Sequence, residues 1–290
     1  MAKVNLRLAD NISGDFYVDS SCIDCDTCRW MTPSVFNRAA GQSVVYHQPT
    51  NETQRLRSLQ ALLACPTSSI GTVEKPVDIK SAIASFPIPI AENVYHCGYH
   101  SEKSYGAASY LIVRPGGNVL VDSPRFAPPL VKRLEEMGGI RYLYLTHRDD
   151  VADHQKFHEY FKCDRILHSD DITTDTRNVE TQLIGLQPFA LDSDLLIIPV
   201  PGHSKGHTVL LSKNFLFTGD HLAWSEGLQQ LVGFPDVCWY SWSKQVESMR
   251  QLLHYSFEWV LPGHGRRYHA DTATMHQKMQ QCVTWMESVR

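Results

Sequence analysis

The sequence contains no long apolar run, no block of basic residues, no low-complexity segment and no internal repeat. A helix that spans a bilayer needs roughly 18 consecutive apolar residues, and no stretch of this chain approaches that length. Met1 to Asp10 alternate charged and apolar side chains, so this segment lacks the apolar core of a secretory signal. A formal net charge of −4 argues against nucleic acid or an anionic membrane as the main partner. The sequence therefore predicts a protein of the cytoplasm, or of a comparable reducing compartment.

The length of 290 residues allows one large domain or two ordinary ones, and 43% hydrophobic residues suffice for a sizeable core. A seam is expected around Pro87 and Pro89, because two prolines in a short run favour an extended linker or an edge strand. We therefore predict a first domain over 1–75, a linker over 76–90 and a second domain over 91–290. The oligomeric state does not follow from the sequence.

Apolar periodicity places secondary structure on both sides of the seam. Leucines at helical spacing predict a helix over 52–64 in the otherwise loop-rich first domain. After the seam, strands are expected over 109–114 and 118–122, and a helix over 128–137, so that short strands alternate with helices. The apolar stretch 223–240 has few signals of regular structure and is expected to be a loop over a substrate pocket.

Four of the eight cysteines are organised: Cys22, Cys25 and Cys28 at two-residue intervals, and Cys65 followed by Pro66. Three thiolates on one tight loop and a fourth from a distance are the ligand set of an iron–sulfur cluster. A zinc site and free buried cysteines are the alternatives. Zinc sites usually pair one CxxC with another or with histidines, so the spacing favours the cluster.

The residues around these cysteines resemble those of a known family. Residues 22–36 (CIDCDTCRWMTPSVF) are similar to the cluster-binding loop of single-cluster bacterial ferredoxins, and ACP at 64–66 is similar to their closing segment. The resemblance covers most of 15–75. Asp26 departs from it, because such ferredoxins often have glycine there, and glycine tolerates the positive φ of tight loops better. The resemblance implies one [4Fe–4S] cluster bound by Cys22, Cys25, Cys28 and Cys65.

Histidines and aspartates gather in four turns, each of which follows a short apolar strand. Imidazole and carboxylate ligands suit zinc, iron or manganese. One such histidine alone is more often structural, but four turns of the same composition favour a metal site. The turns lie at 146–154, 201–204, 218–221 and 262–265.

These turns resemble, in composition and order, those of the metallo-β-lactamase superfamily over about 91–268. The resemblance implies an α+β chain whose second domain is an αββα sandwich with metals at one edge of the paired sheets. It assigns catalytic roles to Asp153, which would orient or deprotonate a metal-bound water, and to Asp220, which would bridge two ions. The family's metal ligands correspond to His147, Asp153, His154, His203, Asp220 and His264.

The first turn departs from the family's His-x-His-x-Asp-His pattern, because two residues are inserted and the second histidine is replaced. Counting from His147, the replacement is Asp149; counting back from the Asp-His pair at 153–154, it is Val151, which cannot bind a metal. We favour Asp149, by analogy with the carboxylate at this place in flavodiiron proteins. The alternative is that Asp149 and Asp150 are solvated loop charges.

The fusion favours redox chemistry, because hydrolysis has no need of electrons and would leave the ferredoxin part unexplained. The sequence predicts a metalloenzyme with a dinuclear or mononuclear site, iron favoured over zinc, that receives electrons from the cluster and acts on a small molecule. An external electron donor is the expected partner. A zinc hydrolase of glyoxalase II type and an iron–sulfur redox sensor with a degenerate metal site remain open. In the dinuclear arrangement, one ion is held by His147, Asp149 and His203, the other by Asp153, His154 and His264, with Asp220 between them.

Overall fold

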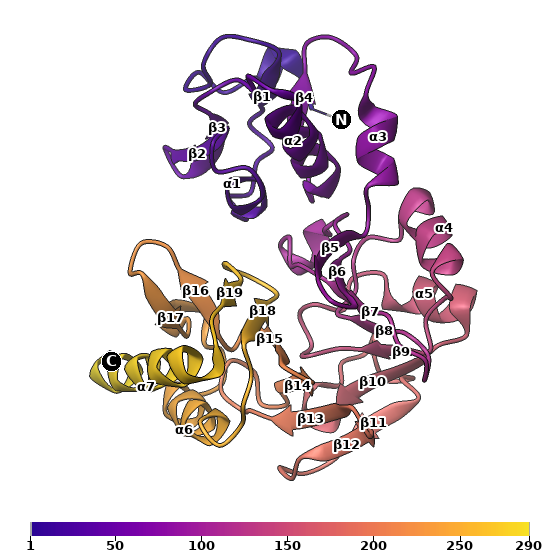
Figure 1. Cartoon of the computed structure of the whole chain (residues 1–290), viewed down its shortest axis with the longest axis vertical. Helices are drawn as coiled ribbons and strands as arrows, with labels where there is room; N and C mark the ends of the chain where they lie inside the picture. The colour runs from indigo at the N-terminus through magenta and orange to yellow at the C-terminus, as the bar shows by residue number, and fades with distance from the viewer. Residues whose placement is uncertain (1, 290) are drawn as a thin grey trace.

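The computed structural model describes residues 2–289 and has two parts, a small N-terminal domain and a larger domain built on two sheets (Figure 1). This division confirms the predicted α+β class. Among the described residues, no helix combines the length and the apolarity needed to cross a membrane. The N-terminal elements are η1 (Val4–Leu6), β1 (Phe16–Val18), α1 (Thr27–Met31), β2 (Phe36–Ala39), β3 (Gln42–Val45), α2 (Glu52–Ala64) and β4 (Ile70–Thr72).

The N-terminal domain is closed by an antiparallel pair, β1 with β4, in which Val18 lies opposite Ile70. Its main helix, α2, begins after Asn51, whose side chain accepts a hydrogen bond of 2.9 Å from the backbone N–H of Gln54. This helix confirms the one predicted over 52–64. The core of the domain includes Phe16, Val35, Phe36, Leu59 and Ile70.

The larger domain contains two main sheets, a short hairpin and helices on both outer sides. The first sheet runs in the order β11 (Thr181–Leu183), β10 (Asp164–His168), β9 (Tyr142–Tyr144), β8 (Val119–Val121), β7 (Tyr110–Ile112), β6 (Val94–His96) and β5 (Ile88–Ala91). The second runs in the order β12 (Phe189–Asp192), β13 (Leu195–Pro199), β14 (Thr208–Ser212), β15 (Phe215–Gly219), β18 (Trp259–Pro262) and β19 (Tyr268–His269). The remaining elements are α3 (Ile79–Ala84), η2 (Glu102–Ser104), α4 (Pro128–Glu136), α5 (His154–Phe161), η3 (Ser169–Asp171), β16 (Ala223–Ser225), β17 (Gln230–Val232), η4 (Pro235–Val237), α6 (Trp242–Leu252) and α7 (Thr272–Ser288).

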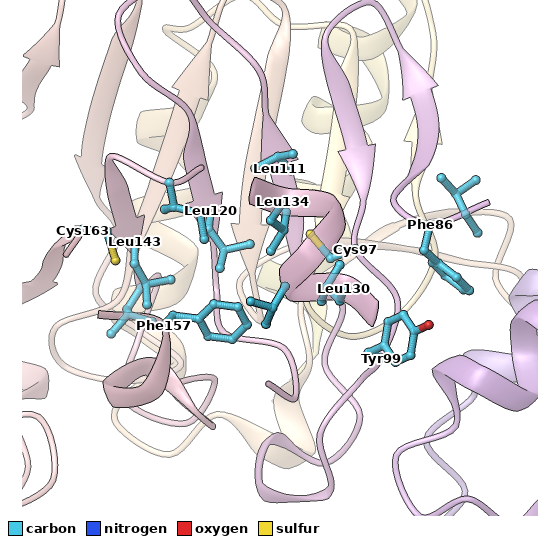
Figure 2. Close-up of a cluster of buried hydrophobic side chains, with 14 of the residues drawn as sticks. Phe86, Cys97, Tyr99, Leu111, Leu120, Leu130, Leu134, Leu143, Phe157 and Cys163 are labelled. Atoms are coloured by element: carbon cyan, nitrogen blue, oxygen red, sulfur yellow. The ribbon is translucent and has the colours of Figure 1, made fainter. Parts of the chain in front are cut away.

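Each main sheet is buried on both faces, which gives four layers, αββα. Side chains along β7 alternate: Leu111 points into the core under α4 and α5, whereas Tyr110 points between the sheets. Figure 2 shows the outer core, where Leu130 and Leu134 of α4 lie over the sheet. The inner core joins residues of the two sheets, among them Val119, Tyr144, Ile197, Leu210 and Phe217.

The predicted linker over 76–90 is wrong at its C-terminal end. β5 (Ile88–Ala91) already belongs to the first sheet, and α3 (Ile79–Ala84) occupies the middle of the predicted linker. Pro89 sits in this strand because β5 is the edge of the sheet, where a residue without an N–H group breaks no ladder on the open side. The proline signal therefore marked an edge strand instead of a connection.

The two domains share apolar contacts. Met31 of α1 and Leu63 of α2 pack against the outer core of the second domain as well as against their own core. Trp30 packs against the inner core, and the guanidinium of Arg267 lies 4.6 Å from the centre of its ring. The N-terminal domain is thus held against the second domain by side chains that contribute to the packing of both.

We expect Leu63→Ala to lower the free energy of unfolding by about 2 kcal/mol, because it removes apolar contacts in both cores. Leu56→Ala is the matched control: it lies on the same helix but is 36% exposed, and we expect about 0.5 kcal/mol or less. Urea unfolding followed by circular dichroism measures both. Equal effects of the two changes would contradict the described docking of α2.

Candidate metal centres

The four organised cysteines line one cavity beside the N-terminus of α1. The loop that carries three of them needs left-handed backbone at Asp24 (φ 59°) and at Asp26 (φ 64°). Aspartate is a poor residue for this conformation compared with glycine, but Arg29 holds it in place: its Nε donates a hydrogen bond of 2.5 Å to Asp26 Oδ1. The hydrogen bond from Arg29 therefore stabilises an aspartate at a position where similar ferredoxins often have glycine.

The sulfur positions suit a cluster better than a single ion. A tetrahedral zinc site with Zn–S bonds of about 2.3 Å needs sulfurs about 3.8 Å apart, whereas within residues 2–289 no three cysteine sulfurs lie within 4.8 Å of one another. Backbone N–H groups of Ser43 and Ser69 donate to the sulfurs of Cys22 (3.4 Å) and Cys65 (3.2 Å). Burial raises the pKa of Cys25 to about 11, so its thiolate form requires a neighbouring cation such as iron.

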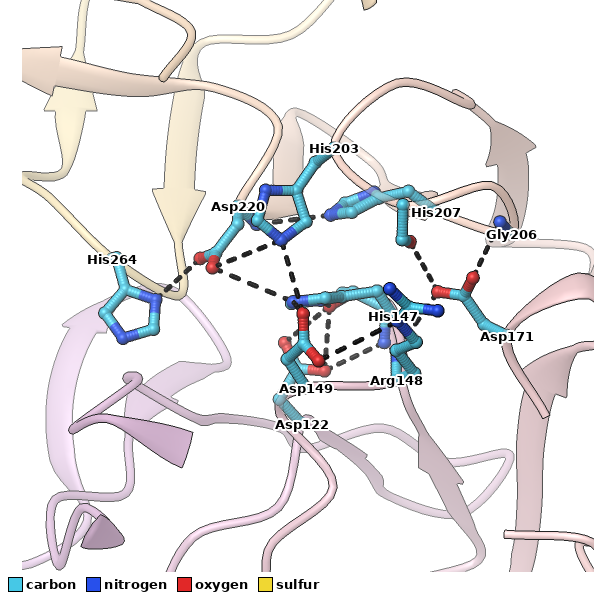
Figure 3. Close-up of polar contacts among 12 residues, drawn as sticks. Asp122, His147, Arg148, Asp149, Asp171, His203, Gly206, His207, Asp220 and His264 are labelled. Carbon is cyan, nitrogen blue, oxygen red and sulfur yellow. Dashed lines mark hydrogen bonds and ion pairs between the residues drawn. The ribbon is translucent and has the colours of Figure 1, made fainter. Parts of the chain in front are cut away.

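A second group of metal-binding atoms comes from the turns after β9, β13 and β15 (Figure 3). His147 Nε2 and His203 Nε2 lie 3.7 and 3.8 Å from Asp220 Oδ2. Asp149 Oδ2 lies 3.8 and 3.6 Å from the same two nitrogens. Ligand atoms around a tetrahedral ion with bonds of about 2.1 Å are about 3.4 Å apart. Small side-chain movements would therefore let these four residues bind one ion.

The other oxygen of Asp220 belongs to a second group, formed with Asp150 and His264, whose atoms lie within 4.8 Å of one another. His264 Nδ1 donates a hydrogen bond of 2.7 Å to Asp220 Oδ1. One carboxylate thus faces both groups through different oxygens. If two ions were bound, Asp220 would be the residue that could contribute to both groups.

The protonation of these residues fits metal binding. Burial lowers the pKa of His147 to about 4, so its imidazole is neutral at pH 7, as a metal ligand must be. Burial also acts to lower the pKa of His264, but the Asp220 carboxylate raises it to about 10. A positive charge is therefore favoured beside Asp220, and a metal ion in place of the proton would supply one.

Buried polar atoms without partners converge on the same place. Such atoms cost free energy unless an ion or water satisfies them, and they are rare in folded proteins. An ion held by both groups would satisfy most of them, which is the structural reason to regard the two groups as a metal site. Within residues 2–289, the unpartnered buried atoms that belong to the two groups are His147 Nε2, both ring nitrogens of His203, both carboxylate oxygens of Asp150 and His264 Nε2.

Neighbouring side chains orient the candidate ligands. Thr146 Oγ1 donates to Asp122 Oδ1 at 3.0 Å and accepts at 3.0 Å from Nδ1 of His147, which leaves Nε2 of that ring free for an ion. His207 Nε2 accepts a hydrogen bond of 3.2 Å from the backbone N–H of Asp220. The ligand-bearing turns are therefore held by hydrogen bonds that the ion itself does not provide.

A further positioning residue, Asp171 of η3, joins two of the turns (Figure 3). Its carboxylate accepts hydrogen bonds from the backbone N–H groups of Arg148 (3.1 Å) and Gly206 (2.7 Å), and from the hydroxyl of Ser204. Asp171 lies far from both turns in sequence and belongs to no recognisable motif, so sequence reasoning missed it.

Asp153 and His154, predicted as ligands and in part as catalytic, belong to neither group. Asp153 Oδ2 accepts a hydrogen bond of 2.9 Å from the backbone N–H of Phe126, and its other oxygen pairs with Lys103 and Lys156. The imidazole Nδ1 of His154 lies 3.2 Å from Nη1 of the buried Arg165. This corrects the prediction for the second ion.

The conformation of the first turn accompanies this correction. The chain passes through Ala152 (φ 22°) before α5 begins, Asp150 lies beside Asp220 and His264, and the Asp-His pair lies outside both groups. Asp150 is 1% exposed and is therefore no solvated loop charge. The adjacent carboxylates of Asp149 and Asp150 were the only sequence signal for it, and that signal did not show which of them points inward.

Comparison with known proteins divides the chain in the same way. Residues 18–72 match the family model of the 4Fe-4S single cluster domain of ferredoxin I. The N-terminal part is a ferredoxin domain. No curated protein sequence matches this chain.

Solved metallo-β-lactamases resemble the second domain. The DIM-1 metallo-β-lactamase is 17% identical with a TM-score of 0.53, over 69% of this chain and 95% of that one. The FIM-1 enzyme from Pseudomonas aeruginosa, in its mono-zinc form, is 16% identical with a TM-score of 0.51, over 70% and 95%. A metallo-β-lactamase from Pontibacter korlensis is 14% identical with a TM-score of 0.51, over 69% and 98%. The second domain has the metallo-β-lactamase fold.

One cavity of about 570 Å³ joins the ferredoxin domain to the candidate metal ligands. Cys25 of the cysteine loop lines one part of it, and residues of both metal-binding groups line another. The expected loop over 223–240 contains the hairpin β16–β17, and the segment after this hairpin contributes an apolar wall of Phe234, Val237 and Trp239. The candidate metal ligands that line the cavity are Asp149, Asp150, His203, Asp220 and His264.

We expect Cys65→Ala to abolish the broad visible absorption of the anaerobically purified protein and its acid-labile sulfide, because one cluster iron would lose its thiolate. Cys163→Ala is the control, since Cys163 is buried in the core of the other domain. Loss of colour in the control, or its retention in Cys65→Ala, would show that the cysteines are assigned wrongly.

We expect Asp150→Ala to lower the metal content of the His/Asp site by about one ion per chain, because it removes a buried ligand. Asp153→Ala should leave the metal content unchanged, since its carboxylate pairs with lysines. Elemental analysis, corrected for cluster iron by the sulfide content, measures both. The opposite ranking would restore the assignment made from the sequence.

Proposed function

We propose that this chain is a metal-dependent oxidoreductase that acts on a small molecule, with electrons supplied through the ferredoxin domain. The observation that carries the proposal is the shared cavity, in which Cys25, a cluster ligand of the ferredoxin domain, and the His/Asp groups line the same space. A hydrolase with an appended cluster has no need of such an arrangement.

The segment between the two centres supports this proposal. Tyr105 donates a hydrogen bond of 2.5 Å from its hydroxyl to the backbone carbonyl of Ile23, and its ring centre lies 6.2 Å from that of His264. At Gly106, an added Cβ would lie 2.8 Å from Cys25 Cβ. Both residues therefore lie against the cysteine loop or Cys25, and Tyr105 also lies beside a candidate metal ligand.

The donor set favours iron. Three carboxylates and three imidazoles make up the two groups, and carboxylate oxygens are harder ligands than the imidazole nitrogens that a histidine-richer site would offer. When bound, the cluster would supply single electrons and iron at the His/Asp site would supply the means to use them on an oxidant such as dioxygen. An external reductant is required as the electron donor.

The cavity indicates what kind of substrate the site takes. Phe234, Val237 and Trp239 offer apolar contacts, and Lys103 places an ammonium group at the same cavity. Such a wall excludes water from an apolar part of the substrate, whereas the ammonium group of Lys103 is already paired with Asp153. We therefore infer a small, partly apolar molecule.

The decisive comparison is between iron and zinc at the His/Asp site in protein whose cluster is intact. After reduction with dithionite and removal of the excess, we expect dioxygen to reoxidise the cluster at least about tenfold faster in the iron form than in the zinc form. The zinc form corrects for direct attack of dioxygen on the cluster. Stopped-flow visible absorption measures the rates.

The same two preparations test the rival, a zinc hydrolase. Its signature would be rapid turnover of esters or thioesters by the zinc form, at a rate that is the same with oxidised and with reduced cluster. Equal reoxidation rates in the iron and zinc forms would refute electron transfer to this site.

A further inference from the structure

A second cavity, of about 600 Å³, lies between the two domains and shares no lining residue with the first. The ferredoxin domain contributes residues of α1 and α2, and the second domain contributes residues of β5, β6, β16 and the segment that leads into β19. Neither domain alone would form it. The lining residues that matter here are Trp30, Arg57, Glu226, Arg266 and Arg267.

The cavity collects positive charge that the protein does not neutralise. Three arginines line it, against one carboxylate, the exposed Glu226. Within residues 2–289, neither Arg57 nor Arg267 has a carboxylate within 4.0 Å, and Arg266 is 3.9 Å from the nearest, Asp26. Like charges brought together from two domains oppose docking unless an anion lies between them.

The guanidinium of Arg267 is held between two aromatic rings and has hydrogen-bond donors that residues 2–289 do not use. Its guanidinium lies 4.6 Å from the ring centre of Trp30 and 5.3 Å from that of Tyr110, one from each domain. Its Nε and Nη2 atoms are buried and, among the described residues, have no hydrogen-bond partner. A guanidinium that is fixed and unsatisfied favours a bidentate anionic partner such as a phosphate or a carboxylate.

We propose that this cavity is a binding site for a small molecule with phosphate or carboxylate groups, held by Arg57, Arg266 and Arg267. The volume exceeds what one inorganic anion needs, and arginines from different elements suit a molecule with more than one anionic group. The ligand would contact both domains, so its binding would stabilise their docking. The proposal is independent of the reaction at the metal site.

Calorimetric titration of the brown holoprotein at low ionic strength tests the site with two probes, phosphoglycolate and glutarate. We expect saturable binding of at least one of them with a dissociation constant below about 1 mM, together with a rise in the unfolding temperature. Binding of phosphoglycolate alone assigns a phosphate ligand, and equal or tighter binding of glutarate assigns a dicarboxylate.

Substitutions locate the binding. Arg267→Gln and Arg57→Gln should each weaken it about tenfold or more, whereas Arg177→Gln, an exposed arginine elsewhere, should not change it. Glu226→Gln should maintain or tighten binding, because it removes the only negative charge of the lining. Arg57 is exposed, so its variant is informative even if loss of Arg267 disturbs folding.

Absence of saturable binding of both probes would overturn the proposal. So would binding that Arg57→Gln and Arg267→Gln leave unchanged, because the probes would then be held elsewhere, for instance at the His/Asp site. Loss of binding in Asp150→Ala with full binding in Arg57→Gln would lead to the same conclusion.

Discussion

The carboxylate of Asp220 joins two halves of a site that different sheets supply. It follows β15 of the second sheet, whereas His147, Asp149 and Asp150 follow β9 of the first. One of its oxygens faces the histidine pair and the other faces His264. The backbone N–H of Asp220 donates a hydrogen bond to His207 Nε2, which helps to keep the Asp220 side chain between the two groups. The metal-binding arrangement therefore depends on the packing of sheet against sheet.

The docking of the ferredoxin domain against the second domain determines which residues surround that site. Gly106 lets the second domain approach Cys25 so closely that any side chain at this position would collide with the cysteine. Close approach places the cysteine loop in the wall of the substrate cavity on one side and leaves an arginine-lined cavity on the other. The same interface thus underlies both the proposed redox path and the proposed anion site. Both would be lost if the domains were connected only by a flexible linker.

Sequence reasoning succeeded where a motif is local. The spacing of Cys22, Cys25 and Cys28 holds within one loop, and the closing Cys65 follows a helix whose periodicity is plain. It failed at the first histidine turn, where an insertion changed which carboxylate points inward. The direction of a side chain in an irregular turn depends on backbone angles such as φ at Ala152. Motif spacing in the sequence does not determine these angles.

By itself the sequence determined the two domain types. It also identified four cysteines as candidate cluster ligands and His147, His203, Asp220 and His264 as candidate metal ligands, because these residues follow regular strands or a short spaced motif. Only the tertiary structure decided that Asp150, and not the Asp-His pair at 153–154, lies beside Asp220 and His264, that Asp171 joins two turns, and that both candidate centres line one cavity. The physical reason is the range of the interactions. Periodicity and spacing are encoded within a few residues, whereas the convergence of turns and domains depends on packing between segments that are distant in the chain.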